Sequence, residues 1–280
     1  MRSHSGFLGG GVGPSAFGGS GELPAPVPVA GAELLINGGF DNGSSWGFEA
    51  PFSISGGTAN KAATGTASLS QGTSAAHTWY QIAFDVVSIS GGTIRSWIGG
   101  GAVGANRTAP GSYLDILRHT SNFTFALNSN DSACVCSVDN FSVKQLSISS
   151  LFSTRAYASA NCDLSAAVTR TASTQAGFVA RLDSASSPAN FLIAYLAGAG
   201  NVKVDKCVAG VYTNVISGAV TYVAGRVLRL VCNGTSVSAY YNDTQVGTTQ
   251  TVSDAGIVSN TRHGLFSTYA ANSFAGYVAA

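Results

Sequence analysis

Apolar and polar residues alternate in short runs along most of the chain from residue 34 onward, and Gly, Ser and Asn residues separate the runs. Such alternation sends successive side chains to opposite faces, which is the pattern of a half-buried β-strand. In "SNFTFALN" it places Phe123, Phe125 and Leu127 on one face and Ala126 on the other. No stretch keeps the period of an amphipathic helix for more than a turn or two. The sequence therefore predicts an all-β protein.

The same alternating pattern starts again at "SISSLFS" without a long linker. This restart divides the chain into two β units. In the second unit, "NFLIAYLA" is apolar on both faces and predicts a strand covered on both sides. The stretch "VLRLVCNGTSVSAYYNDTQVGT" predicts three strands joined by tight turns at "NGT" and "ND". We therefore expect two tandem β-sandwiches, at residues 34–147 and 148–280.

Residues 1–33 have a different composition and form an extended Gly/Pro-rich arm. The arm ends in "LPAPVPVAG", where alternating prolines stiffen the chain and prevent it from joining a central strand. We interpret residues 24–28 as a spacer and the preceding residues as an anchor that binds a neighbouring protein. The side chains expected to insert into that neighbour are Phe7, Leu8, Val12 and Phe17.

Charge is scarce in this sequence, since only 10% of the residues are charged and the formal net charge is +1. Without a cluster of Lys and Arg, there is no electrostatic footprint for nucleic acid. No apolar run approaches the length of about 18 residues that a membrane span needs. The start, "MRSHSGFLGGG", lacks the apolar region of a secretory signal, so we expect synthesis and assembly in a cytoplasm.

The inventory of carboxylates and nucleophiles argues against an enzyme. Glycosidases use a pair of carboxyl groups, yet the three glutamates are Glu22, Glu33 and Glu49, and none follows residue 50. The aspartates of the second unit are scattered, and neither a Gly-x-Ser-x-Gly elbow nor a phosphate-binding loop is present. We expect a protein without catalytic residues or a cofactor.

The cysteines do not form a disulfide framework, because their number is odd and their spacing is irregular. We expect buried, reduced thiols, and no histidine lies at zinc-ligand spacing from them. The five cysteines are Cys134, Cys136, Cys162, Cys207 and Cys232.

Two motifs in residues 34–146, "LLINGGFDNGSSWGF" and "CSVDNFSVKQL", resemble the jelly-roll family of carbohydrate-binding modules. The resemblance implies that Trp46 packs in the core. Some relatives carry a structural calcium ion, and the carboxylates left for one here are Asp41 and Asp139.

The second unit resembles the concanavalin-A-like (laminin-G-like) sandwich through "GFVARLDSASSPANFLIAYLAGAGNVKVDK" and "DAGIVSNTRHGLFSTYAANSF". Such modules behind a Gly-rich arm look like parts of tailed-bacteriophage virions: head decorations, head fibres or tail fibres. This resemblance implies a non-enzymatic structural component of the virion. It would be anchored through its arm to capsid or tail proteins, and it would form a homo-oligomer.

The alternative hypothesis is a lectin-like protein that attaches to a host or cell-surface polysaccharide. Sugars stack on exposed aromatic rings, although core packing is the competing interpretation for every such ring in a sandwich. Because "TWYQ" sends its two rings to opposite faces of one strand, we expect one of them to face solvent or to line a sheet edge. The glycan-binding candidates are Trp79, Tyr80, Trp97 and Tyr240. A cell-surface adhesin is a third hypothesis, disfavoured by the missing signal sequence.

Overall fold

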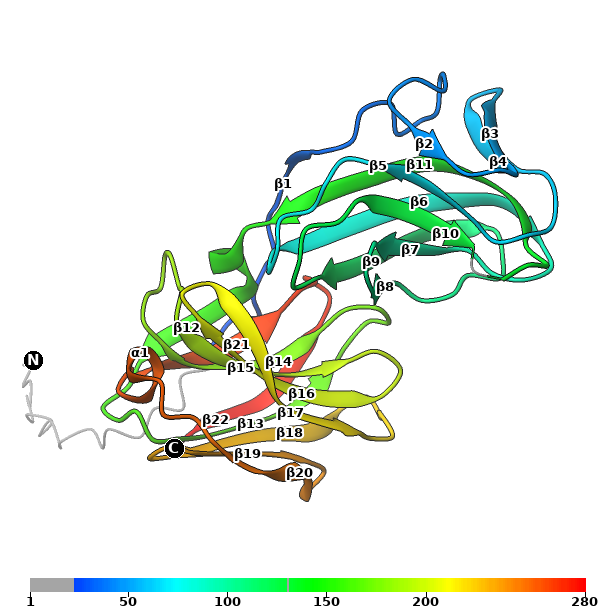
Figure 1. The fold of residues 1–280 in the computed structure, drawn as a ribbon. Coiled ribbons are helices and arrows are strands. Elements are labelled where there is room, and N and C mark those ends of the chain that lie inside the picture. The colour runs from blue at the N-terminus through cyan, green and yellow to red at the C-terminus, as the bar shows by residue number, and fades with distance from the viewer. Residues whose placement is uncertain (1–22, 130) are drawn as a thin grey trace, which may run out of the picture.

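The computed structural model describes residues 23–129 and 131–280, and almost all the regular elements in that part of the chain are β-strands. The exceptions are one 3-10 turn, η1 (Ile148–Leu151), and one single-turn helix, α1 (Ala255–Val258). Figure 1 shows two layered units, one coloured blue to green and the other green to red. The strands form four antiparallel sheets, so the prediction of two tandem sandwiches is confirmed.

The first sandwich consists of a six-stranded and a five-stranded sheet. The larger sheet has the order β3-β4-β11-β6-β9, with β1 also paired to β11. Its strands are β1 (Ala30–Glu33), β3 (Phe52–Ser55), β4 (Thr58–Lys61), β6 (Trp79–Ser90), β9 (Gly111–Arg118) and β11 (Val135–Leu146). The smaller sheet has the order β2-β5-β10-β7-β8. Its strands are β2 (Gly47–Phe48), β5 (Ala67–Gln71), β7 (Arg95–Ile98), β8 (Ala102–Val103) and β10 (Phe125–Ser129).

Trp46 packs in the core of the first sandwich, as the jelly-roll resemblance implies. Its ring lies between Phe40 and Phe141, with centroid distances of 4.9 and 5.8 Å. The indole Nε1 donates to the carbonyl of Asn37 at 3.0 Å, so the polar edge of this buried ring is satisfied. The two motifs at the ends of this unit therefore meet in one aromatic cluster.

The second sandwich also consists of a six-stranded and a five-stranded sheet. The larger sheet has the order β12-β21-β14-β15-β16-β17. Its strands are β12 (Phe152–Ala156), β14 (Ala176–Leu182), β15 (Phe191–Ala197), β16 (Asn201–Val208), β17 (Val211–Ala219) and β21 (Arg262–Ser267). The smaller sheet has the order β20-β19-β18-β13-β22. Its strands are β13 (Cys162–Thr169), β18 (Arg226–Asn233), β19 (Ser236–Tyr241), β20 (Thr244–Thr251) and β22 (Ser273–Ala279).

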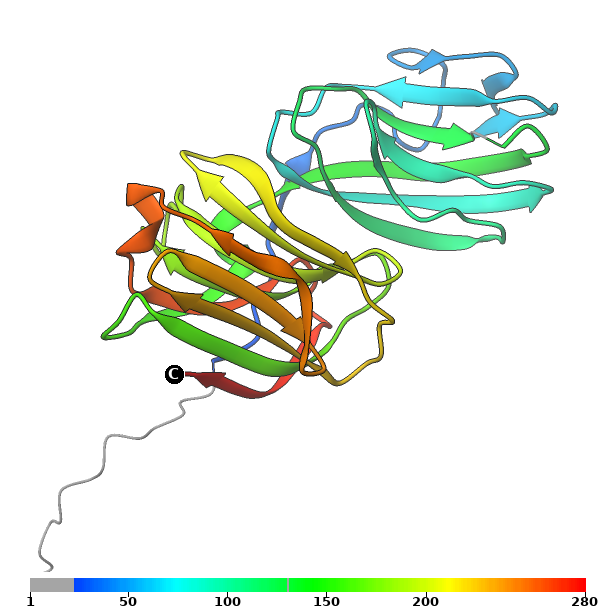
Figure 2. The same cartoon turned by 60° about the horizontal axis from the view of Figure 1, so that its bottom comes forward.

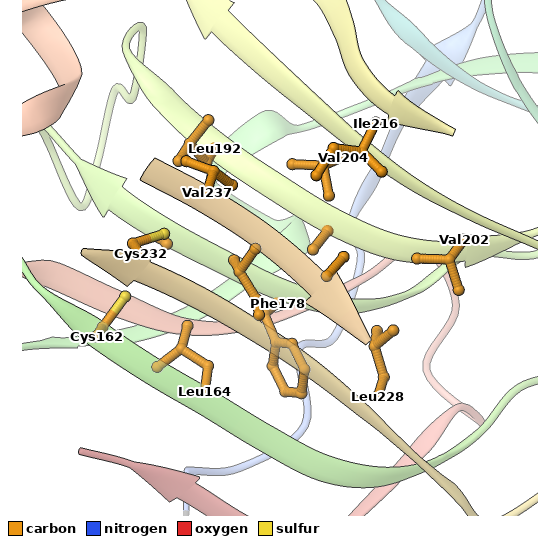
Figure 3. Close-up of a cluster of buried hydrophobic side chains, with 14 of the residues drawn as sticks. Cys162, Leu164, Phe178, Leu192, Val202, Val204, Ile216, Leu228, Cys232 and Val237 are labelled. Carbon is orange, nitrogen blue, oxygen red and sulfur yellow. The ribbon is translucent and has the colours of Figure 1, made fainter. Parts of the chain in front are cut away.

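Mostly aliphatic side chains, together with Phe178, two cysteines and two tyrosines, fill the space between these two sheets, and Figure 3 shows part of this cluster. Leu228 and Leu230 alternate with exposed or half-buried positions along β18 and are both fully buried, which agrees with the pattern in the sequence. The predicted turn between β19 and β20 is present, because Asn242 and Asp243 have φ angles of 49° and 64°. Positive φ at both central residues is what a tight hairpin turn requires.

The larger sheet of the second sandwich is buried on both faces. Leu192 and Leu196 of β15 point into the sandwich core, whereas Ile193 and Tyr195 belong to a separate apolar cluster on the opposite face. Side chains of the first sandwich, Trp79 among them, complete that cluster. The strand predicted to be covered on both sides is therefore covered by its own sandwich and by the other one.

Residues 23–33, which we call the strap, contact both sandwiches. Leu23 packs against the core of the second sandwich, and Pro26 is buried. The Val29 N–H donates to Ser150 Oγ at 2.8 Å, and β1 then pairs with β11 of the first sandwich. In Figure 1 this segment is the dark blue ribbon at the junction. Residues 24–28 are therefore tethered at both ends, with Pro26 buried and Val27 exposed, rather than a free spacer.

Because β1 lies in the strap, the first sandwich begins at residue 30 and not at residue 34 as predicted. Residues 30–33 are assigned to the arm by composition, yet they are a strand of the first sandwich's larger sheet. The anchoring side chains predicted from the sequence, Phe7, Leu8, Val12 and Phe17, lie outside the described residues.

Candidate functional site

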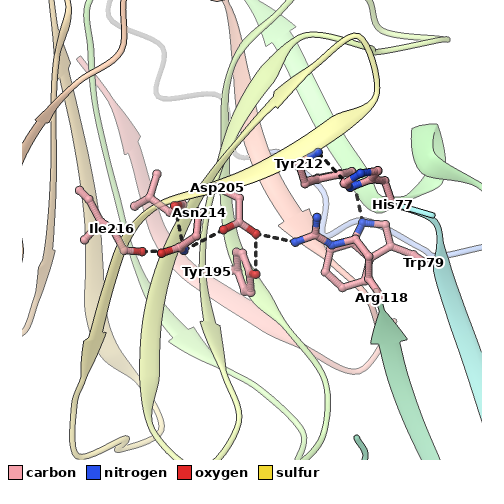
Figure 4. A network of polar contacts seen from close by, with 9 residues as sticks. His77, Trp79, Arg118, Tyr195, Asp205, Tyr212, Asn214 and Ile216 are labelled. Atoms are coloured by element: carbon pink, nitrogen blue, oxygen red, sulfur yellow. Dashed lines mark hydrogen bonds and ion pairs between the residues drawn. The ribbon is translucent and has the colours of Figure 1, made fainter. Parts of the chain in front are cut away.

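Arg118 at the end of β9 joins the two sandwiches (Figure 4). Its guanidinium lies 4.8 Å from the ring centroid of Trp79 in the first sandwich and 3.8 Å from that of Tyr212 in the second. Its Nη2 forms an ion pair with Asp205 Oδ2 at 2.5 Å. Arginine suits this position because its planar group stacks on rings and still donates in its plane.

Asp205 receives two further hydrogen bonds. Tyr195 Oη donates to its Oδ2 at 2.8 Å, and Asn214 Nδ2 donates to its Oδ1 at 2.9 Å. Burial, together with the neighbouring Asp205 carboxylate, raises the pKa of Tyr195 well above its usual range, so the phenol remains a donor. The buried carboxylate is thus satisfied on both oxygens (Figure 4).

Trp79 and Tyr80 are both buried, with 4% and 3% of their surface exposed. Trp79 points toward the second sandwich, where its Nε1 donates to Tyr212 Oη at 3.2 Å. Tyr80 points into the core of the first sandwich, where its ring packs against Phe125 at 4.8 Å. This placement corrects the expectation that one of these two rings faces solvent. The alternation on β6 is as predicted, but each face of this strand end is covered.

Tyr240 is half-buried on β19, and the Arg229 guanidinium lies 5.3 Å from its ring centroid. Arg229 is itself held by an ion pair with Asp163 of the neighbouring strand β13. A ring with a fixed cation over it offers a sugar little free surface for stacking.

Trp97 is half-buried on the outward face of the smaller sheet of the first sandwich. Its neighbours on that face are Ala126 on β10, Val103 on β8 and, one strand beyond Ala126, Ser70 on β5. Trp79 and Tyr80 are buried and Tyr240 has a cation over its ring, whereas Trp97 keeps part of its surface exposed. Of the four candidates, Trp97 is therefore the ring best placed to meet a ligand.

A row of polar side chains lies two positions along the strands from Trp97, on the same face. Arg95 Nη2 donates to Asn128 Oδ1 at 3.5 Å, and Asn128 Nδ2 donates to Ser68 Oγ at 3.4 Å. The row ends with Ser68 Oγ donating to Glu49 Oε2 at 3.1 Å. The two longest bonds are weak, so their groups can exchange partners with a ligand. We call Trp97 and these four residues the Trp97 face.

Two adjacent cavities of about 640 and 460 Å³ lie where the sandwiches meet. They share Val103, Ile116 and Leu117 of the first sandwich and Gln175 of the second, so we describe them together as the inter-domain groove. Loops between strands form most of the wall on the side of the second sandwich. The residues that reach the groove from there include Arg170, Ser173, Gly198, Lys203 and Tyr222.

The carboxylate that lines the groove is neutralised within the protein. Asp115 is fully buried, pairs with Arg107 at 2.5 Å and accepts from Ser96 Oγ at 2.6 Å. Arg170 and Lys203, in contrast, are in none of the ion pairs formed by residues 23–129 and 131–280. The sequence did not single out either residue, because neither belongs to a motif or to a cluster of basic residues.

The two carboxylates considered for calcium are not gathered into a site. Asp41 is exposed, whereas Asp139 faces Asp85 across β11 and β6, and Asn140 hydrogen-bonds to both of these carboxylates. Across the described ranges, no group of three or more His, Cys, Asp or Glu side chains is arranged to hold a metal ion. The geometry therefore gives no support to a calcium site at Asp41 and Asp139.

All five cysteines are buried and free, as the sequence indicates. Burial raises the pKa of Cys136 to about 12, with the neighbouring Cys134 adding to the effect. Burial likewise raises the pKa of Cys207 to about 12. Thiols with such pKa values stay protonated at neutral pH and are poor nucleophiles.

No protein-family profile matches this sequence, and no curated protein matches it. Three solved structures illustrate its similarity to other folds. Carbohydrate-binding module CBM66 from Bacillus subtilis is 15% identical, with a TM-score of 0.38, and the match covers 46% of this chain and 81% of the module. Sheep galectin-11 is 6% identical, with a TM-score of 0.35, over 46% of this chain and 96% of the galectin.

The third is the CBM2 module of an evolved Dit protein from Lactobacillus casei BL23 phage J-1. It is 9% identical, with a TM-score of 0.22, over 91% of this chain and 93% of the module. All three scores are low, so the function proposed below is based on the residues of this chain. Within residues 23–129 and 131–280, no helix is long and apolar enough to span a membrane.

Proposed function

We propose that this protein is a non-enzymatic carbohydrate-binding protein and that its Trp97 face holds the glycan. The observation that carries the proposal is a partly exposed indole beside a row of loosely paired polar side chains on one outward sheet face. A pyranose ring has an apolar face that stacks on an indole and hydroxyl groups around its edge. The Trp97 face offers both kinds of contact side by side.

The polar row suits hydroxyl groups in particular. Arg95 supplies donors, Glu49 supplies acceptors, and Asn128 supplies both, so either role of a hydroxyl can be met. Since the sheet face is open rather than a closed pocket, it suits an extended polysaccharide rather than the end of a chain. Host or cell-surface polysaccharides are the ligands that we propose.

Two observations support the non-enzymatic part of the proposal. The sequence has no glutamate after residue 49, and the aspartates at the junction, Asp115 and Asp205, are each held by an arginine. A glycosidase acid must carry a proton that it can give to the leaving oxygen. Carboxylates held in ion pairs do not supply one.

The test is retention of the full chain on insoluble or arrayed polysaccharides. Trp97→Ala removes the stacking ring and abolishes retention. Trp97→Phe keeps a smaller aromatic ring, so part of the retention remains. Tyr240→Ala is the matched control, since it removes an aromatic ring from the other sandwich and leaves retention unchanged. Equal retention by Trp97→Ala and the native protein contradicts the proposal. New reducing ends in the incubated glycan contradict its non-enzymatic part.

A role in a phage virion remains a second proposal, and it depends on the arm. A head or tail structural protein needs an anchor, and the residues predicted to provide it precede the strap. The strap supports this proposal in one respect: it fastens residues 23–33 to both sandwiches, so a pull on the arm is borne by the folded domains. Glycan binding and attachment to a particle are compatible in one molecule.

A further inference from the structure

The inter-domain groove has uncompensated positive charge at two separate places. Arg170 lies at the part of the groove that includes Tyr222, and Lys203 lies at the part that includes Tyr195. Neither forms an ion pair with a carboxylate of the described residues. A cation removed from water without a counter-ion favours an anionic ligand, because the ligand restores the lost interaction.

Arg170 is strongly held in place. Only 9% of the residue is exposed, Nη1 donates to the Thr174 carbonyl at 3.3 Å, and Nη2 donates to the Gly198 carbonyl. Its Nε has no hydrogen-bond partner among the described residues, and the guanidinium lies 4.6 Å from the Tyr222 ring centroid. Burial lowers the pKa of Arg170, because it removes water from around the charged group. These contacts fix the direction of its charge without neutralising it.

Lys203 is half-buried on β16 and shares its sheet face with Tyr195, its cross-strand partner. Its ammonium group makes no hydrogen bond within the described ranges, in contrast to Lys206 on the same strand, which pairs with Asp254. Lys203 is therefore free to bind a ligand, and removing its charge breaks no contact of the fold.

We propose that the inter-domain groove binds an acidic oligosaccharide, with its negative groups at Arg170 and Lys203. Two cations at separate places along one groove suit a ligand that repeats its charge, as a chain of uronic acid or sulfated sugars does. The Ser173 hydroxyl, which accepts from Arg107, can still donate to a sugar hydroxyl, whereas the amide of Gln175 is held by Ile116 and Thr268. Val103, which lines both parts of the groove and is 41% exposed, gives a sugar ring an apolar contact. The groove shares no residue with the Trp97 face, although Val103 pairs with Trp97 across β8 and β7.

Calorimetric titration of the full chain at low ionic strength tests the proposal. The probes are a hexagalacturonate, a sulfated heparin-derived hexasaccharide and neutral cellohexaose. We expect at least one acidic probe to bind and cellohexaose not to bind in the groove. Added salt weakens the binding, because the charges that drive it are partly exposed to solvent. The two acidic probes distinguish carboxylate from sulfate as the recognised group.

Single substitutions test whether the acidic probe binds at Lys203 and Arg170. Lys203→Gln weakens binding of the acidic probe by about tenfold or more, since it removes a charge-assisted contact. Lys206→Gln, the same change on the same strand, leaves binding unchanged, and so does Trp97→Ala. Arg170→Gln is expected to weaken binding too. Because Arg170 holds two loops together, its loss also affects folding, so Lys203→Gln is the variant that tests the site.

Three results overturn the proposal: no binding of either acidic probe, equal binding by Lys203→Gln and the native protein, or loss of acidic binding in Trp97→Ala. The last result would assign the acidic sugar to the Trp97 face. Conversely, loss of polysaccharide retention in Trp97→Ala with acidic binding intact supports both sites separately. Failure of one proposal is therefore distinguishable from failure of the other.

Discussion

Arg118 of the first sandwich and Asp205 of the second form an ion pair of 2.5 Å, although 87 positions separate them in the chain. Their side chains are only 11% and 5% exposed, so both charges are largely removed from water. Such a pair specifies one relative placement of its two elements, because any other placement leaves a buried charge without a partner. The groove between the sandwiches depends on that placement.

Replacing Arg118 with methionine leaves the Asp205 carboxylate buried without its cation. We expect a loss of about 3–5 kcal/mol in the free energy of unfolding. The measurement is denaturant-induced unfolding followed by tryptophan fluorescence, since Trp79 lies against Arg118. In the double variant Arg118→Met/Asp205→Asn we expect part of the loss to be recovered.

The matched control is the less buried pair between Lys206 and Asp254, whose side chains are 29% and 27% exposed. Lys206→Met should cost no more than about 1 kcal/mol, because solvent screens the pair. Equal losses of unfolding free energy in Arg118→Met and Lys206→Met would show that the Arg118–Asp205 pair stabilises the fold no more than the less buried pair does.

His263 makes stability depend on pH. Burial lowers its pKa, and the charge of Arg181 lowers it further. Its Nδ1 accepts the Arg181 backbone N–H at 3.0 Å, an interaction that requires the neutral ring. Because the pKa is lower in the folded state than the unfolded value of 6.5, the stabilisation is complete above pH 6.5 and is lost as pH falls below it.

Thermal unfolding measured between pH 5 and 8 checks this expectation. The native protein should lose stability as the pH falls below 6.5, and His263→Gln should show a shallower pH dependence whatever its absolute stability. Burial also lowers the pKa of His77, so His77→Gln should remove a further part of the slope. An unchanged slope in both variants contradicts the assignment.

Gly104 has no room for a side chain. An added Cβ would collide with Asp115 Oδ2 and Ser96 Oγ, which are hydrogen-bonded to each other in the wall of the groove. Gly104→Ala should therefore destabilise the first sandwich, as a lower melting temperature. Gly39→Ala is the control, since nothing lies within 4 Å of its Cβ, and it should be neutral or stabilising by up to about 1 kcal/mol.

The buried thiols should not react in the native protein. With pKa values near 12, Cys136 and Cys207 have almost no thiolate at neutral pH, and both are buried. We expect a disulfide exchange reagent to label no cysteine until denaturant is added, and then all five. Rapid labelling without denaturant would indicate that the sandwiches open locally.

Because the strap contacts both sandwiches, two deletions of different length separate its role from that of the arm before it. Deleting residues 1–22 removes the predicted anchor and spares every contact of Leu23 and β1, so the sandwiches should fold as in the full chain. Deleting residues 1–33 should lower the melting temperature, because β1 is lost. If the shorter deletion still joins its particle at full occupancy, the anchoring hypothesis fails.

Local patterns predicted the elements well because they report local chemistry. Alternation along β18 and β19 and the Asn-Asp turn after Tyr241 each depend on a few neighbouring residues. The strand β15 was also predicted as covered on both faces, since every residue from Phe191 to Leu196 is apolar. The sequence pattern does not show that the first sandwich covers the second face of β15.

The sites were harder to predict because they depend on distant segments. The alternation around Trp79 and Tyr80 indicates opposite faces, but only the fold shows that the second sandwich covers one of those faces. The groove joins residues near 103, 116, 170 and 203, none of which forms a motif with the others. Trp97 remained a good candidate because it lies half-buried on an outward sheet face, which the fold reveals and the sequence does not.

The strap also has a consequence for synthesis. Its residues are made before either sandwich, yet Leu23 packs against the core of the second one. While the second sandwich is still being translated, the first can close its own sheets, but Leu23 has nothing to pack against. Docking of Leu23 therefore waits until the second sandwich has folded. A chain whose translation stops within the second sandwich would leave Leu23 undocked, and the strap open to proteases that remove incomplete products.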